Sequence, residues 1–500
     1  MEVSNILKIT HAFPFFRCPN GDYWALVDVA GRFSALRVGS NEFEDLVHDL
    51  YYASFQDAPS PAAFRCALGV IRAKTRASAK VCDVALRIGR DDGALYYDTR
   101  DERGRIIKVT SGGWGVIANP PCAFWQPPGM LGVDSPHTEN GHDPDLVDAA
   151  FGVMFPGLSE KQRMLLVMWC VHSLIVGAPC PLLHLIGPPR SGIALLARII
   201  KRAIDPCAGE SLLKPKEAKD LILATRSMRI VLLGDFSSLP QALADAVYGI
   251  LTGASIRPRK LYTDDDVTIT SVQRAVILTS HDDIVRARGL REFRIRIDAI
   301  ENLLAGPEME VWRDFENYRR TILGGLFSAV SYGIGHLDSI RDSGLCYVNE
   351  FGLWTAAAAP AFGWDSEQWL RVYRENMGEQ MVDALDASVI GRPLVEMVRA
   401  RGRLSVTASQ LLEMLRTLVR DRSLLPADHK ALGTQLNKIA SALRNAGIVF
   451  RRDNTKARDH KPFLVFDVDG AQEESHPTRP NAKPPSVDDC GNLVYDDSEE

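Results

Sequence analysis

The chain lacks several features that would assign it to a class at once. Its nine cysteines are isolated, with no C-x-x-C pair, which argues against a zinc site and suits a reducing compartment. No apolar run approaches the roughly 20 residues that span a bilayer. The residues after Met1 also lack the basic start of a signal peptide. We therefore expect a cytoplasmic protein with no membrane partner.

An excess of positive charge is missing too. The 500 residues carry a net charge of −5, so any contact with nucleic acid has to come from local basic patches. With 46% hydrophobic residues, the chain is long enough for about three globular domains.

The most informative segment is a phosphate-binding loop whose chemistry is missing. Residues 187–194 read G-P-P-R-S-G-I-A, between the apolar run 181–186 and the helix-like run 195–204. This is the strand, glycine-rich turn and helix with which P-loops cradle phosphates. The pattern G-x-x-x-x-G-K-[ST] needs a lysine for the phosphates and a hydroxyl for Mg²⁺. Ile193 and Ala194 hold those two positions, and the stretch alone equally fits an ordinary βα turn.

Two further apolar strands follow at the right distance. Residues 229–234 are followed by Asp235, at the place where a P-loop ATPase has the acid that holds Mg²⁺. Residues 274–280 end in Ser280. The candidate nucleotide-binding residues are Gly187, Pro188, Pro189, Arg190, Ser191, Gly192, Ile193, Ala194, Asp235 and Ser280, with Asp235 as a Mg²⁺ ligand only if nucleotide binds.

This order of motifs resembles the AAA+ ATPases found beside primases in phages, plasmids and integrative elements, which are helicase-like proteins acting on DNA. The resemblance covers most of residues 1–468 and is densest from 205 to 280. It implies ATP and Mg²⁺ as the ligands of an intact site, a γ-phosphate sensor at Ser280, and a hairpin at 252–266 near a central DNA channel. It also implies assembly into an oligomer, of this chain or with a related ATPase.

The chain departs from the family where hydrolysis would occur. Phe236 follows the acid in place of Asn, Ser280 replaces the sensor Asn, and Phe293 stands at the finger position, where a one-residue slip would recruit Arg291 or Arg294. Contacts of Arg and Mg²⁺ to a transferring phosphoryl group are worth about 10³ to 10⁵ in rate. Their joint loss argues against turnover, and no residue is assigned a catalytic role.

The pattern predicts an α/β protein of several domains. The expected parts are an N-terminal α+β domain (1–126), a linker (127–145), an AAA+ P-loop domain with a parallel sheet (146–388), a C-terminal winged helix (389–468) and a disordered acidic tail (469–500).

DNA contacts are expected in two places. A hairpin beside the channel should contact single-stranded DNA, and the recognition helix 434–445 with the wing 451–461 should contact duplex phosphates with slight sequence preference. The candidates are Arg257, Arg259, Lys260 and Tyr262 in the hairpin, Lys438 and Arg444 in the helix, and Arg451, Arg452 and Lys456 in the wing.

Three functional hypotheses remain open. The favoured one is a DNA-binding, helicase-like subunit of mobile-element replication that does not hydrolyse ATP. The second is an active ATP-dependent DNA helicase that uses a substitute cation such as Arg190. The third is a role in immunity or in regulating another element, which the sequence does not address.

Overall fold

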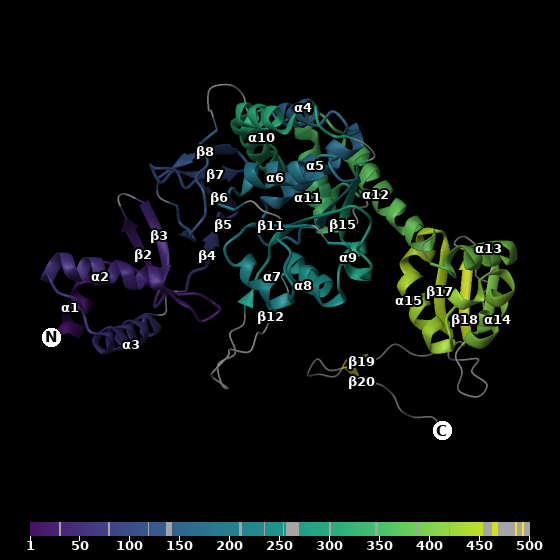
Figure 1. Ribbon diagram of the computed structural model, residues 1–500, viewed down its shortest axis with the longest axis horizontal. Helices are drawn as coiled ribbons and strands as arrows, with labels where there is room; N and C mark the ends of the chain where they lie inside the picture. Colours follow the sequence, from purple (N-terminus) through teal and green to yellow (C-terminus); the bar gives the residue numbers. More distant parts are fainter. Residues whose placement is uncertain are drawn as a thin grey trace. The chain divides into compact units, whose positions relative to one another are not determined.

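The computed structural model describes most of the chain and divides it into two compact units, Met1–Gln380 and Met381–Glu500 (Figure 1). The described residues are 1–29, 32–78, 81–118, 120–136, 143–209, 213–234, 236–253, 255–256, 270–299, 302–345, 349–386, 388–419, 421–453, 463–468, 486–487 and 493–494.

The first unit begins with a small antiparallel sheet, β1-β2-β3, covered by three helices. Its elements are α1 (Glu2–Ile9), β1 (Phe15–Arg17), β2 (Tyr23–Val29), β3 (Arg32–Arg37), α2 (Asn41–Phe55) and α3 (Pro61–Ala77). Helices α2 and α3 begin where they do because Ser40 and Ser60 accept hydrogen bonds from N–H groups of the first turn. Phe43 and Phe64 join Ile6 in one hydrophobic core.

A six-stranded sheet follows in the order β8-β7-β6-β5-β4-β9, in which β4 and β9 are parallel. Its strands are β4 (Val84–Leu86), β5 (Ile88–Asp91), β6 (Ala94–Asp98), β7 (Ile106–Thr110), β8 (Gly113–Ile117) and β9 (Ala123–Trp125). The Tyr97 ring lies 5.2 Å from that of Phe327, and its hydroxyl donates to the Ile204 carbonyl oxygen at 2.7 Å. This sheet therefore shares a core with the helices that follow it.

The centre of the unit is a four-stranded parallel sheet in the order β11-β14-β10-β15. The strands are β10 (Leu182–Ile186), β11 (Ile230–Leu233), β14 (Ala275–Ser280) and β15 (Arg294–Asp298). Every residue of β10, β11 and β14 is buried, which explains why they appear in the sequence as continuous apolar runs. In open parallel sheets, ligands bind beyond the carboxyl ends of the strands.

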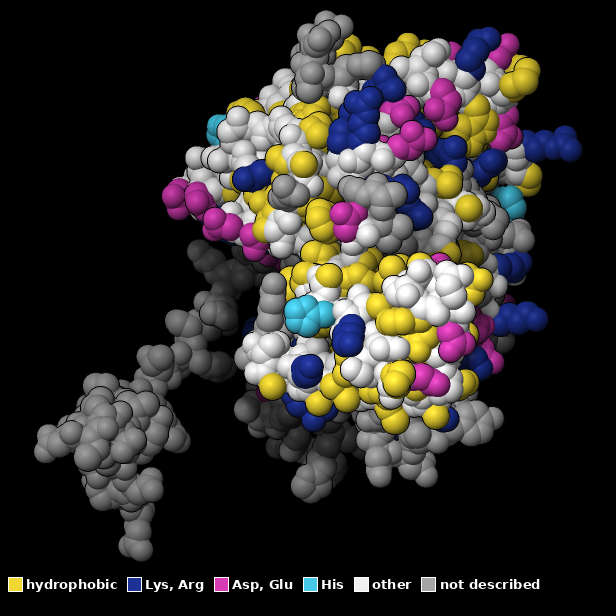
Figure 2. Space-filling view, turned by 90° about the vertical axis from the view of Figure 1, so that its left-hand side faces the viewer, with side chains coloured by type: hydrophobic (Ala, Val, Ile, Leu, Met, Phe, Trp, Pro, Cys, Tyr) yellow, Lys and Arg dark blue, Asp and Glu magenta, His cyan; other side chains and the backbone are white. Residues whose placement is uncertain are grey.

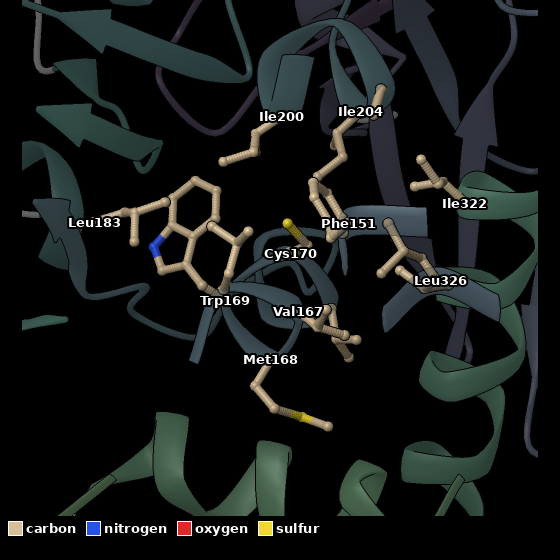
Figure 3. Packing of buried hydrophobic residues seen from close by; sticks show 14 of the residues in the cluster. Phe151, Val167, Met168, Trp169, Cys170, Leu183, Ile200, Ile204, Ile322 and Leu326 are labelled. Carbon is tan, nitrogen blue, oxygen red and sulfur yellow. The ribbon is translucent and has the colours of Figure 1, made fainter. Parts of the chain in front are cut away.

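Helices pack around this sheet. They are α4 (Asp145–Met154), α5 (Glu160–Ser173), α6 (Ile193–Ile204), α7 (Ala218–Thr225), α8 (Gln241–Thr252), α9 (Arg288–Glu292), α10 (Glu308–Asp342), α11 (Glu350–Ala358), η1 (Ala359–Phe362) and α12 (Ser366–Asp386), with the short pair β12 (Ser255–Ile256) and β13 (Thr270–Ser271) after α8. Figure 3 shows Trp169 of α5 in the same packed region as Leu183 of β10 and Ile200 of α6. None of the described helices is long and apolar enough to cross a membrane.

The second unit contains α13 (Gly391–Arg401), β16 (Arg403–Thr407), α14 (Ala408–Leu418), η2 (Arg422–Leu424), α15 (His429–Asn445), β17 (Ile448–Asp453) and β18 (Phe463–Val468). The three strands form an antiparallel sheet in the order β16-β18-β17. Asp428 is the N-cap of helix α15, and its carboxylate accepts the Ala431 N–H at 2.8 Å. Leu394, Leu412, Leu436 and Phe466 share its core.

The α/β prediction with a parallel sheet is confirmed, and β10, α6, β11 and β14 lie within one or two residues of the expected ranges. Strand β16 was not predicted, because a five-residue segment between two helices carries little periodicity of its own. The predicted acidic tail lies mostly outside the described residues, apart from the paired strands β19 (Ser486–Val487) and β20 (Leu493–Val494).

Candidate functional site

The phosphate-loop sequence forms the turn between β10 and α6. The Gly187 N–H donates to the Ser280 carbonyl oxygen at 3.1 Å, which ties the turn to the end of β14. Arg190 and Gly192 have φ angles of 67° and 96°, in the left-handed region that favours glycine. Gly192 caps α6 without a side-chain hydrogen bond. The first N–H groups of α6 therefore have no capping side chain to accept their hydrogen bonds, and they face the loop. Such a helix N-terminus suits a bound anion.

A cavity of about 540 Å³ opens at this turn. Its lining residues are Pro188, Pro189, Arg190, Ser191, Gly192, Ile193, Ala194, Leu195, Lys214, Phe236, Ser237, Thr279, Ser280, His281, Leu304 and Glu308. Leu304 lies so close to the turn that a Cβ on Gly192 would meet its Cδ2 atom at 2.6 Å, so a glycine is required there. Residues 188–194 of the predicted loop and Ser280 line this one cavity, whereas Gly187 does not.

The two positions that carry hydrolysis in a P-loop are filled differently here. Ile193 is 8% exposed and belongs to the central hydrophobic core. Its Cγ2 atom lies 3.2 Å from the place a Cβ on Gly187 would take, so the side chain packs against the loop itself. Ala194 is exposed and carries only a methyl group. The loop therefore has the backbone shape of a phosphate cradle without its lysine and hydroxyl.

The described lining does not fit Mg²⁺. Hard cations of this kind take oxygen ligands, usually one or two carboxylates beside the phosphates. Among the described lining residues, Glu308 is the one carboxylate, and its Oε1 accepts from Arg198 at 2.9 Å. Asp235, the predicted Mg²⁺ ligand, lies outside the described residues.

One polar atom in the turn has no partner. The Ser191 hydroxyl belongs to a residue that is 3% exposed and makes no hydrogen bond to any residue the structure describes. Buried hydroxyls without partners are costly in folded proteins. This one lines the cavity, where an anion could accept its hydrogen bond.

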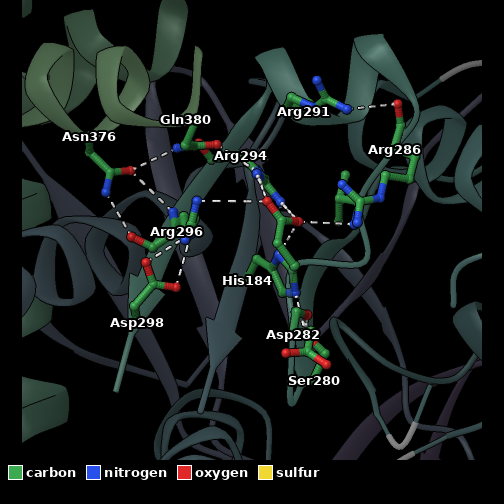
Figure 4. A network of polar contacts seen from close by, with 12 residues as sticks. His184, Ser280, Asp282, Arg286, Arg291, Arg294, Arg296, Asp298, Asn376 and Gln380 are labelled. Atoms are coloured by element: carbon green, nitrogen blue, oxygen red, sulfur yellow. Dashed lines mark hydrogen bonds and ion pairs between the residues drawn. The ribbon is translucent and has the colours of Figure 1, made fainter. Parts of the chain in front are cut away.

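At the sensor position, Ser280 belongs to a buried polar network (Figure 4). Arg294 Nη1 lies 3.0 Å from His184 Nδ1, and because arginine only donates, Nδ1 must be the acceptor. His184 Nε2 then donates to Ser280 Oγ at 2.8 Å, and Ser280 Oγ donates to the Asp282 carbonyl oxygen at 2.6 Å. Burial lowers the pKa of His184 to about 3, with Arg294 acting in the same direction. The sensor hydroxyl is thus engaged within the fold.

The residues considered for the arginine-finger position all make contacts within this chain. Phe293 ends α9 and packs against the core beside α8. Arg294 is 1% exposed and holds Asp283 through two contacts of 2.7 Å, so it is not placed to reach a neighbouring subunit. Burial would raise the pKa of Asp283, but hydrogen bonds and charge from Arg294 hold it well below its ordinary range. Arg291 donates to the Arg286 carbonyl oxygen at 3.1 Å.

Helix α12 completes the outer edge of the sheet. Asn376 accepts the Arg296 N–H at 3.1 Å and donates to the Arg296 carbonyl oxygen at 2.7 Å, as a neighbouring strand would. Gln380 accepts from Arg294 Nε at 2.6 Å. Two amide side chains therefore satisfy the polar groups of β15, an edge strand.

The second unit offers a different kind of surface. Residues 390–467 hold fifteen Lys and Arg against seven Asp and Glu, a net charge of +8 in a chain of net charge −5. Helix α15 contains no acidic residue. Its predicted residues Lys438 and Arg444 are both exposed, on the side opposite its buried leucines. This is where the chain concentrates positive charge.

The two wing arginines lie on opposite faces of the sheet. Arg451 pairs with Asp467 at 3.1 Å, and Arg403 pairs with the same carboxylate at 3.2 Å. Arg452 turns the other way and donates to Asn437 Oδ1 on α15 at 3.1 Å. Only Arg452 of the two therefore adds to the face of α15.

By contrast, the face viewed in Figure 2 has no dominant charge among the side chains drawn in colour. Lys and Arg side chains are interspersed there with Asp, Glu and scattered hydrophobic groups. The hairpin candidates Arg257, Arg259, Lys260 and Tyr262 and the wing residue Lys456 lie outside the described residues.

Sequence reasoning missed several residues. Lys430, Thr434 and Asn437 share the exposed side of α15, and their helical spacing is a signal that was present. The partners of His184 could not be found in the same way. Asp283 and Arg294 lie about a hundred positions away, and a lone histidine in an apolar strand does not identify them.

These features define an α/β protein with a phosphate-loop turn and a second unit that contains the basic segment 390–467. A family model described as "Actinomycete integrative conjugative element replication protein" matches residues 153–335. A second model, "AICE RepA C-terminal domain", matches residues 390–467. Together they span more than half of the chain, which belongs to this family of replication proteins. The expected resemblance to proteins of integrative elements is thereby confirmed.

No curated protein matches the chain. Among solved structures, it is similar to the apo C-terminal region of NrS-1, with 12% identity, a TM-score of 0.41 and coverage of 93% of this chain and 98% of that chain. It is also similar to SCCmec type IV Cch, described as an active helicase, with 12% identity, a TM-score of 0.41 and coverage of 91% of this chain and 93% of that chain. For JCV helicase the identity is 14% and the TM-score is 0.24, with coverage of 46% of this chain and 68% of that chain. Such low TM-scores carry no weight for function.

Proposed function

We propose that this replication protein is a DNA-binding subunit that keeps the shape of an ATPase but does not hydrolyse ATP. The observation that carries the proposal is the burial of Ile193 in the hydrophobic core, at the position where a P-loop lysine would reach the phosphates. It would act in the cytoplasm as an oligomer, of this chain or with a related ATPase.

The polar groups around the cavity support the same conclusion. Phosphoryl transfer depends almost entirely on positioning and on cations that neutralise the developing charge. Ala194 supplies no Mg²⁺ ligand, Ser280 is engaged by His184, and Arg294 is engaged by Asp283. The groups that would lower the barrier are either replaced or already bound within the fold.

DNA binding is assigned to the second unit. Its order of helices and strands, α13-β16-α14-α15-β17-β18, is that of a winged helix, with α15 as the recognition helix. The net charge of +8 and the acid-free α15 complement a phosphate backbone. In this proposal Lys438, Arg444 and Arg452 contact duplex DNA. The candidates Arg257, Arg259, Lys260 and Tyr262 of the expected hairpin 252–266 contact single strands.

The test is calorimetry of ATP binding to the full chain, with and without Mg²⁺ and single-stranded DNA, together with an assay of phosphate release. We expect weak or Mg²⁺-independent binding and no turnover. Micromolar, Mg²⁺-dependent binding accompanied by turnover would overturn the proposal.

One observation favours the alternative of an active helicase. Arg190 lines the cavity in a left-handed conformation and makes no ion pair with any residue the structure describes, so its guanidinium is available to a phosphate. If Arg190 replaces the lysine, Arg190→Ala should abolish turnover of the wild-type protein, whereas Arg198→Ala, which loses an exposed pair with Glu308, should not.

A further inference from the structure

The exposed side of α15 combines cations with amide chemistry. Leu432, Leu436, Ile439, Ala442 and Leu443 are buried in the core of the second unit. The opposite side exposes Lys430, Thr434, Asn437, Lys438 and Arg444, which lie along one helical face. Cations therefore lie toward both ends of the face, and an amide lies near its middle.

The amide is held in place from the neighbouring strand. Arg452 of β17 reaches across to α15 and donates to Asn437 Oδ1 at 3.1 Å. The same guanidinium nitrogen lies 3.7 Å from the place a Cβ on Gly433 would take, which puts the arginine in van der Waals range of the helix at that turn. Because Arg452 contacts the carbonyl oxygen, the donor end of the amide lies away from it.

An amide held beside a guanidinium can contact phosphates, but it also carries the donor and acceptor groups that read base edges. Lys430, Lys438 and Arg444 already supply this face with positive charge for phosphate contacts. In the major groove of duplex DNA, Arg reads guanine by donating to N7 and O6, and Asn reads adenine by donating to N7 and accepting from the N6 amino group. An amide oxygen has two lone pairs, so Asn437 Oδ1 can accept from Arg452 and from a base. Duplex RNA is a poor alternative, since its major groove is too deep and narrow for a helix.

We infer that Asn437 and Arg452 form a base-reading pair that recognises adjacent purines in the major groove of duplex DNA. This inference rests on the proposed DNA binding by the second unit. It goes beyond the expectation from sequence, which was phosphate contact with slight sequence preference. Arg452 has two roles here, because it fixes the orientation of Asn437 and presents donors of its own.

The experiment uses the full chain and a pool of short DNA duplexes with a randomised centre. Bound duplexes are sequenced for the wild type, for Asn437→Ala and for Lys430→Ala as the matched control. We expect the wild type to enrich a purine step by roughly 5- to 150-fold over other steps. Asn437→Ala should flatten that preference. Lys430→Ala should keep it while lowering affinity for every sequence, with a salt slope reduced by about 0.9.

The positioning role of Arg452 has its own readout. Arg452→Lys keeps the charge but cannot hold the amide with the same planar geometry. It should retain most of the overall affinity and lose the preference at the position that Asn437 reads. Unchanged thermal midpoints of all three variants would show that their folds are intact.

The outcomes separate the inference from the proposal on which it rests. A wild-type protein that binds no duplex at low salt contradicts the proposed DNA binding itself. Duplex binding without enrichment, enrichment that survives Asn437→Ala, or preference for an RNA duplex would each overturn the base-reading pair and leave DNA binding untouched.

Discussion

At the scale of single residues, the proposed lack of ATP hydrolysis rests on the side chain at position 193. The turn, its two left-handed residues and the start of α6 are present. Ile193 packs its side chain in the hydrophobic core, whereas a lysine at this position of a P-loop would reach a bound phosphate. The loop is thus stabilised by burial of an apolar group, about 1.5 to 3 kcal/mol for a side chain of this size.

Restoring the two missing groups should therefore recover nucleotide binding. We predict that the double change Ile193→Lys and Ala194→Thr gives measurable Mg²⁺-dependent ATP binding by calorimetry, because the backbone of the cradle is intact. Full hydrolysis should not return while Phe293 occupies the finger position. The change Ala194→Thr alone is the control and should gain little. A folded double variant that still binds no nucleotide would show that the cradle itself is lost.

Two buried histidines should make the fold sensitive to acid. Burial lowers the pKa of His172 and of His184 to about 3, whereas in the unfolded chain a histidine takes up its proton below about pH 6.5. The unfolded state therefore binds more protons below about pH 6.5. Stability is fully present above that pH and falls as the pH drops toward 3, by up to about 1.4 kcal/mol per pH unit for each histidine.

Urea denaturation followed by the fluorescence of Trp169 and Trp369, which share the core of the first unit, measures this effect. We expect a lower midpoint at about pH 5 than at about pH 7. His172→Phe, beside the Phe351 ring, should reduce the difference, while substitution of the exposed His336 by Gln should not. An equal difference in all three proteins would rule out His172 as a cause.

At the scale of elements, a buried arginine joins the six-stranded sheet to the phosphate-loop helix. Arg87, fully buried after β4, donates to Asp205 at 3.4 Å and to the carbonyl oxygens of Asp98, Leu131 and Pro206. Asp205 ends α6 and also accepts the Arg229 and Ile230 N–H groups. These contacts connect segments more than a hundred residues apart.

Removing that arginine should be far more damaging than removing a surface cation. Arg87→Ala leaves a buried carboxylate and three carbonyls short of a donor, and we expect a loss of about 3 to 5 kcal/mol of stability. The matched control is Lys161→Ala, which breaks an exposed pair with Glu375 and should have little effect on stability. Equal effects of the two changes in urea denaturation would contradict the assignment.

At the scale of the whole molecule, charge is divided unequally along the chain. The net charge of −5 is the sum of −4 over the first unit, +8 over residues 390–467 and −9 over the rest of the second unit. The positive segment is therefore flanked by acidic residues within its own unit. We expect the salt dependence of duplex binding to depend mainly on residues 390–467.

We predict that neutralising Lys430, Lys438 and Arg444 together lowers the log-log salt slope of duplex binding by about 2 to 3, since each phosphate contact releases roughly 0.9 counterion. Arg451→Ala is the control, because Arg451 is paired with Asp467 on the other face of the sheet. It should change the slope much less.

The hairpin is predicted to act on single strands instead. Substitution of Arg257, Arg259 and Lys260 should weaken binding of a single-stranded oligonucleotide and leave duplex binding nearly unchanged. Equal losses on both kinds of DNA would contradict this division between the hairpin and the second unit.

The sequence by itself determined the local structure around the site. The turn at 187–192, the buried strands and the helix that begins at Ile193 follow from glycines and from runs of apolar residues, which act over a few positions. The sequence also showed that Ile193 and Ala194 stand where a P-loop has its lysine and hydroxyl, because this comparison requires no knowledge of contacts between distant residues.

Only the tertiary structure decided what the side chains do. It buried Ile193, paired Arg294 with Asp283, turned Arg451 and Arg452 to opposite faces, and brought β16 beside β18 some sixty positions later. The physical reason is that these pairings satisfy buried polar groups and sheet edges with partners distant in sequence. Periodicity shows which face of an element is buried, but not which residue from another element will meet it.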